Sequence, residues 1–144
     1  TAAIYAAVIH RLVSRDHTFG GGKSPFEHVY VVDGAVAMAG HVMKAGKLGA
    51  PFAHSAKGAI RRRLRSLPPI DFVRDPDSVR SGVGEVENNG VIITLGPIPS
   101  GRNKVEVENN LWCGGLCAQW LTYVLERQEE KWRITGTTGP YAIS

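Results

Sequence analysis

Residues 104–135 read KVEVENNLWCGGLCAQWLTYVLERQEEKWRIT, and this stretch decides the fold. Successive side chains of a strand point to opposite faces of a sheet. On that period, one face of the first segment carries a mostly apolar set: Val105, Val107, Asn109, Leu111 and Cys113. The return segment carries a second set: Cys117, Gln119, Leu121, Tyr123 and Leu125. The stretch therefore predicts three antiparallel strands in sequence, the third containing Trp132 and Ile134.

Cys113 and Cys117 flank the first turn of this sheet. A three-residue loop would place them directly opposite each other, where cross-strand Cβ atoms lie roughly 4.5–5.5 Å apart. Local twist can adjust that separation toward the ~3.8 Å of a disulfide, so a disulfide is one interpretation. The other interpretations are two buried free thiols and half of a zinc site. Because zinc normally takes four ligands and the chain has no second cysteine pair, we expect no metal.

Two amphipathic helices are predicted upstream. Within residues 2–13, Ile4, Val8 and Leu12 fall four residues apart and form an apolar face. Residues 51–67 form the second helix, which begins with a proline and is stopped by the prolines at 68 and 69. Strands are expected over residues 27–33, 70–73 and 91–95.

Three connections are read from their turn residues. Asn89-Gly90 favours a tight hairpin that pairs residues 85–87 with residues 91–95. Gly139-Pro140 is expected to end the last strand, and residues 142 and 143 could extend the edge beyond it. Residues 35–49 fit either a short helix or an irregular excursion.

Together these helices and strands predict a single α+β domain over residues 1–144. Its two helices would pack on a curved, mainly antiparallel sheet.

Composition narrows the class of protein. The chain has 144 residues, 43% hydrophobic and 21% charged, as expected for a globular domain. No apolar run reaches the roughly 18 residues of a membrane span. The formal net charge of +4 is uneven, because residues 1–80 carry 12 Lys/Arg against 6 Asp/Glu. Arg61, Arg62 and Arg65 belong to the densest cluster, which is either a solvated helix face or an anion-binding surface.

The cysteine-containing turn also carries a resemblance. The run Leu111-Trp-Cys-Gly-Gly-Leu-Cys, with Thr122-Tyr-Val-Leu-Glu and Lys131-Trp-Arg-Ile, resembles a pattern in small uncharacterised bacterial proteins. The likeness covers roughly the last forty residues. It implies the closing meander of a cystatin-like or nuclear-transport-factor-like α+β fold. Members of that broader fold include ligand carriers, isomerases, cyclases and interaction modules, so the resemblance implies no one activity.

Candidate chemistry is sparse. Asp16 and His17 are the best acid/base pair, since an imidazole beside a carboxylate follows the first helix and precedes a glycine loop. An aromatic pocket would draw on Tyr5, Trp112 and Trp120. Asp33 is a pocket carboxylate or a turn residue. The sequence contains no nucleophile elbow, zinc-protease motif or cofactor motif.

Three functions follow from these residues. The leading hypothesis is non-catalytic binding of an apolar or amphipathic small molecule between helix and sheet. The second is a hydrolase or isomerase that uses Asp16 and His17, and the third is an interaction module that uses the basic helix over residues 57–65. Nucleic acid is not expected, because no aromatic residue interleaves the arginines. Oligomeric state is left open, a homodimer included, and a disulfide would favour a location outside the cytoplasm.

Overall fold

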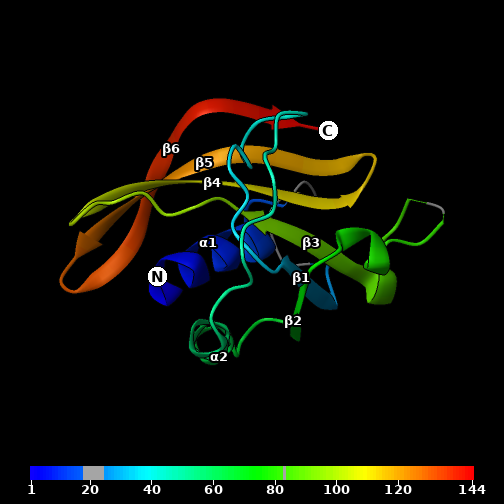
Figure 1. The fold of residues 1–144 in the computed structure, drawn as a ribbon, viewed down its shortest axis with the longest axis horizontal. Helices are drawn as coiled ribbons and strands as arrows, with labels where there is room; N and C mark the ends of the chain where they lie inside the picture. Colours follow the sequence, from blue (N-terminus) through cyan, green and yellow to red (C-terminus); the bar gives the residue numbers. More distant parts are fainter. Residues whose placement is uncertain (18–24, 83) are drawn as a thin grey trace.

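The computed structural model describes residues 1–17, 25–82 and 84–144. Within them lie two α-helices and six strands, and the predicted α+β class is confirmed (Figure 1). In chain order the elements are α1 (Ala2–Ser14), β1 (His28–Val32), α2 (His54–Arg63), β2 (Ile70–Val73), β3 (Gly90–Leu95), β4 (Lys104–Gly114), β5 (Cys117–Gln128) and β6 (Lys131–Ile143). Two short 3-10 turns, Pro76–Val79 and Glu87–Asn89, precede β3.

The strands form one mixed sheet in the order β2-β1-β3-β4-β5-β6. β1 pairs in parallel with both β2 and β3, and β3 to β6 form an antiparallel meander. The parallel pair β1–β2 needs a crossover, and α2 supplies it. The sheet is therefore mainly antiparallel, as predicted, and it leaves β2 and β6 as its edges.

The main core lies between the helices and one face of the sheet. Figure 1 shows both helices on the same side of β4 and β5. Ile9 and Leu12 of α1 are fully buried there, as is Ile60 of α2. The predicted alternation of β4 and β5 is confirmed, because the apolar members of both sets belong to this core. Burial of each large aliphatic side chain contributes roughly 1.5–3 kcal/mol, so this face holds the fold together.

The opposite face of the sheet carries a smaller cluster, which includes Tyr30, Val86 and Ile92 and is flanked by Trp112. Residues 35–49 cross this side as an irregular segment, so the second interpretation of that stretch is the right one. The segment lies very close to the sheet at Gly40, where a Cβ would be 2.8 Å from the carbonyl oxygen of Leu121. Only glycine fits at that distance.

The hairpin predicted across Asn89-Gly90 is wrong. Residues 87–89 form a 3-10 turn instead, in which Asn88 and Asn89 have φ angles of 57° and 53°. A hairpin would need one free edge of β3, yet β1 and β4 occupy both edges. Residue 86 forms only an isolated bridge, with Arg80.

The turn between β4 and β5 is one residue shorter than expected. Gly114 rather than Cys113 pairs with Cys117, and a bulge lies between Trp112 and Gly114. Cys113 and Cys117 nevertheless form a disulfide, with Cα atoms 5.1 Å apart. The bond joins neighbouring strands at the tip of the hairpin, where it holds the register of β4 against β5.

Gly139-Pro140 does not end the last strand, which continues to Ile143. Thr122 pairs with Thr138 and Trp120 with Ala142, so a bulge absorbs the residues around the proline. Proline is tolerated at such a bulge on an edge strand, where its missing N–H leaves no partner unsatisfied.

The second helix is shorter than predicted. It spans His54–Arg63 rather than residues 51–67. Ala53 before it is extended, with φ −59° and ψ 144°. After it, Leu64 leaves helical geometry at φ −111°, four residues before the proline pair.

Candidate functional site

The chain turns sharply where α1 ends. The backbone amides of Arg15 and Asp16 both donate to the carbonyl of Arg11, at 3.0 Å and 2.9 Å. Helical geometry stops at Arg15, where φ is −132°. This closing turn directs the next residues toward β5 rather than onward along the helix axis.

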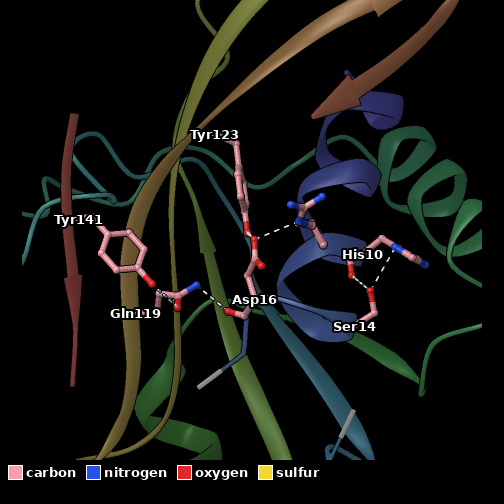
Figure 2. Close-up of polar contacts among 7 residues, drawn as sticks. His10, Ser14, Asp16, Gln119, Tyr123 and Tyr141 are labelled. Carbon is pink, nitrogen blue, oxygen red and sulfur yellow. Dashed lines mark hydrogen bonds and ion pairs between the residues drawn. The ribbon is translucent and has the colours of Figure 1, made fainter. Parts of the chain in front are cut away.

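The Asp16 carboxylate binds across to the sheet. Its Oδ2 accepts a hydrogen bond of 2.6 Å from the Tyr123 hydroxyl and one of 3.1 Å from Nε of Arg11 (Figure 2). Tyr123 is fully buried on the helix-facing side of β5, whereas the Asp16 side chain is 31% exposed. A carboxylate at the rim of the core therefore ties the end of α1 to β5.

Gln119 extends this polar network to the edge strand. Its Nε2 donates to the backbone carbonyl of Asp16 at 2.5 Å, and its Oε1 accepts from the Tyr141 hydroxyl of β6 at 3.1 Å. Figure 2 shows the three side chains in a row from Asp16 through Gln119 to Tyr141. Since Gln119 is only 3% exposed, its amide is held in one orientation by partners on both sides.

A pocket of about 480 Å³ opens beside this network, and we call it the Asp16 pocket. Its polar lining consists of Arg11, Arg15, Asp16, His17, Gln119, Thr137 and Tyr141. Leu121 and Ile143 supply its apolar lining. The volume lies within the range of roughly 300–1,000 Å³ found for small-molecule sites, and the mixture of apolar surface with a few polar groups is typical of them.

Burial and the neighbouring Asp16 carboxylate keep the Tyr123 hydroxyl protonated. Burial raises the pKa of this hydroxyl far above its usual range, and the hydrogen bond to Asp16 and the negative charge of that carboxylate raise it further. Tyr123 is thus a donor at every physiological pH and does not act as a base. The Asp16 oxygen that accepts from it also accepts from Arg11, so that oxygen has a structural role.

The structure brings the predicted pair Asp16 and His17 to the same pocket. The His17 ring is 5% exposed and lies edge-on to the ring of Phe26, with centroids 6.0 Å apart. The two side chains thus differ in environment, one at the rim and one buried. Their catalytic role stays a prediction.

The predicted aromatic pocket residues lie apart. Tyr5 is in the main core, where its hydroxyl donates to the carbonyl of Gly96 at 2.8 Å and burial raises its pKa to about 12. Trp112 packs on the opposite face of the sheet, with the guanidinium of Arg80 over its ring at 4.4 Å. Trp120 shares that face by the strand alternation of β5. These three rings cannot line one pocket, because the sheet separates Tyr5 from the two tryptophans.

Asp33 lies at the end of β1 and is 5% exposed. Its Oδ1 accepts from the backbone amide of Phe52 at 2.9 Å, and its Oδ2 accepts from Lys57 Nζ at 2.5 Å. The residue therefore positions the start of α2 on the sheet. It is neither at the Asp16 pocket nor a simple turn residue.

The arginines of α2 are exposed, whereas Lys57 is held against Asp33. Arg61 is partly engaged, because its Nε donates to the carbonyl of Ile70 and its guanidinium lies 5.0 Å from the ring centre of Phe72. Arg62 and Arg65 form no ion pair with any residue that the structure describes. An anion-binding role for this face stays a prediction.

Gln119, Tyr123 and Tyr141 were not singled out from the sequence. One signal was available for Gln119, since a glutamine stands in a row of buried apolar positions on β5. Such a residue needs hydrogen-bond partners, and those partners indicate a site. Tyr141 gave no comparable signal, because it lies on the exposed edge strand.

Nothing matches this chain in comparisons with protein-family models, with curated proteins or with solved structures. Across residues 1–17, 25–82 and 84–144, no helix has the length and apolar character needed to cross a membrane. Over the same residues, no group of three or more His, Cys, Asp or Glu side chains is placed to hold a metal ion. The function must therefore be argued from the pocket itself.

Proposed function

We propose that the chain binds a small amphipathic molecule in the Asp16 pocket and does not transform it. The observation that carries the proposal is the pocket, which has a volume of about 480 Å³ and is lined by both polar and apolar side chains. Leu121 and Ile143 offer apolar surface to one part of a ligand. Arg15 and Thr137 offer donors to a polar or negatively charged part.

Binding is favoured over catalysis because Asp16 and Gln119, at the centre of the polar network, are bound to other residues of the protein. Asp16 Oδ2 already accepts two hydrogen bonds, and the Gln119 amide is held from both sides. A general base needs an oxygen or nitrogen free to take a proton from the substrate. A network whose Asp16 Oδ2 and Gln119 amide already have partners within the protein is suited to shape a pocket and to orient a ligand.

The resemblance of the last three strands to a cystatin-like meander is in keeping with this proposal, since that broader fold includes ligand carriers. The likeness adds only an analogy, because one fold hosts many functions. The hydrolase or isomerase reading draws on the same pocket, so the experiment must separate it from simple binding.

Anilinonaphthalene sulfonate, an apolar fluorophore with one negative charge, is a suitable probe. We expect its emission to rise on addition of the folded protein, and its affinity to fall about tenfold or more when Thr137→Trp fills the pocket. Thr135→Trp is the matched control, an exposed threonine of the same strand outside the pocket lining. Equal binding by the two variants would overturn the proposal.

An activated ester tests for chemistry. Para-nitrophenyl acetate should be hydrolysed no faster by the wild type than by an Asp16→Asn, His17→Ala double variant. Turnover that depends on these two residues would replace the binding proposal with the catalytic one. Circular dichroism of each variant establishes that the fold is retained.

A further inference from the structure

A groove runs between α1 and the edge strand β6, separate from the interior of the Asp16 pocket. Two adjoining recesses of about 430 Å³ and 410 Å³ form it, and they share Ala7, His10 and Trp132 as lining. We call it the α1/β6 groove. The second recess also shares Arg11 and Arg15 with the Asp16 pocket. The groove therefore runs along α1 from its N-terminal end toward that pocket at its C-terminal end.

The rim of the groove is cationic. The rim residues are Arg15 directly after α1, Arg63 of α2, and Lys131 and Arg133 of β6, and all four side chains are exposed. None of the four forms an ion pair or side-chain hydrogen bond with any residue that the structure describes, although the six ion pairs found elsewhere engage carboxylates. These charges are therefore available to a partner.

The negative charges along the groove are already occupied. Glu130 lines one end and is paired with Arg127 at 3.3 Å. Asp16 lies beyond the other end and is paired with Arg11 at 3.1 Å. The groove thus presents an excess of positive charge, which is complementary to an acidic partner.

The floor of the groove is apolar and shallow. Ala3 and Ala7 of α1 keep it open because their side chains are short, while Trp132 and Ile134 of β6 are half-buried against the main core. A partner that fits must combine apolar side chains, which lie on this floor, with negative charges, which meet the rim.

The length of the groove suits a short extended segment. From Ala3 to Ser14, α1 rises roughly 17 Å at ~1.5 Å per residue. An extended peptide rises about 3.3 Å per residue, so the groove accommodates about five or six residues. The neighbouring edge of β6 also has unpaired backbone groups that a peptide can use and a nucleic acid cannot.

We propose that the α1/β6 groove binds an extended acidic peptide segment of a partner protein, in which apolar residues alternate with carboxylates. A peptide is favoured over a single-stranded nucleic acid because bases need exposed aromatic platforms. The groove offers one tryptophan, itself half-buried, and the small ring of His10, among alanine and isoleucine. This inference does not depend on a ligand in the Asp16 pocket.

The test uses a fluorescein-labelled hexapeptide, Glu-Leu-Glu-Leu-Glu-Leu, and its Gln-Leu counterpart. By fluorescence polarisation at low salt, the acidic peptide should bind and the neutral one should bind at least ~tenfold more weakly. The Arg63→Gln, Lys131→Gln, Arg133→Gln triple variant should lose about tenfold in affinity for the acidic peptide. Lys44→Gln, Lys47→Gln should not, because both lysines are exposed on the irregular segment outside the groove.

Tryptophan emission locates the contact. Trp132 lines the groove, so the unlabelled acidic peptide should change the emission of the wild type and leave that of Trp132→Phe unchanged. Persistence of the emission change in Trp132→Phe would contradict the proposal. Wild-type affinity in the triple variant, an equal loss in the lysine control, or tighter binding of hexauridylate than of the acidic peptide would each overturn it.

Discussion

The bond between Tyr123 and Asp16 should be the main polar contribution to the stability of the α1 terminus. Tyr123→Phe removes only the hydroxyl, and the buried ring keeps its packing in the core. Hydrogen bonds to charged groups contribute roughly 1.5–3 kcal/mol, and neutral ones roughly 0.5–1.5 kcal/mol. The Asp16 side chain is 31% exposed, so water replaces part of the lost bond. We therefore expect a loss near the lower limit, about 1.5–2 kcal/mol.

Tyr5→Phe is the matched control. Its hydroxyl is also buried but donates to the neutral carbonyl of Gly96, so the expected loss is about 1 kcal/mol or less. Urea unfolding followed by circular dichroism, with the disulfide intact, measures both. Tyr123→Phe should also lower Tm by roughly 3–8 °C. A loss for Tyr123→Phe that is smaller than the loss for Tyr5→Phe would refute the role assigned to Asp16.

Three other predictions concern buried polar groups. Because the pKa of Tyr5 is about 12 in the folded protein, ionisation of this residue leaves stability unchanged below pH ~10 and lowers the unfolding free energy by about 2–3 kcal/mol as the pH rises from 10 toward 12. Tyr5→Phe should therefore flatten the fall in unfolding free energy over that window. Asn109 is fully buried and its Oδ1 has no hydrogen-bond partner among the described residues, so Asn109→Leu should stabilise the protein by about 1 kcal/mol or more in thermal unfolding. Lys57→Met leaves the buried Asp33 carboxylate without its cation and should cost about 3 kcal/mol, whereas adding Asp33→Asn should restore much of the loss.

The outcomes that would contradict these three predictions are distinct. If the unfolding free energy falls above pH 10 as steeply in Tyr5→Phe as in the wild type, the pKa of the Tyr5 hydroxyl does not change on unfolding. Destabilisation by Asn109→Leu would mean that the amide is satisfied in solution, for example by an internal water. If the Asp33→Asn, Lys57→Met double variant is less stable than Lys57→Met alone, the two side chains are not coupled.

The C-terminal sheet could be predicted because its information is local. The period of two in residues 104–126 assigns the faces of β4 and β5 without any knowledge of other elements. The same reasoning misled at Asn89-Gly90, where turn preference indicates a hairpin. The neighbours of β3 are β1 and β4, and only the assembled sheet shows that both of its edges are taken.

The candidate site could be predicted only in part. The end of α1 follows from its apolar face, and Asp16 and His17 follow directly after it. The partners of Asp16 are 103 and 107 residues away, at Gln119 and Tyr123, and no periodicity or motif connects them. The strand alternation had already placed Trp112 and Trp120 on the face opposite to the core, so their exclusion from a pocket with Tyr5 was implicit in the sequence.

The most direct test of the proposed function is an assigned amide spectrum titrated with anilinonaphthalene sulfonate. The Asp16 pocket predicts saturable shifts concentrated at Arg15, Asp16, Gln119, Thr137 and Tyr141, with little change at Trp112 and Trp120 on the other face. Saturable shifts confined to that other face would contradict the account, as would the absence of any saturable shift.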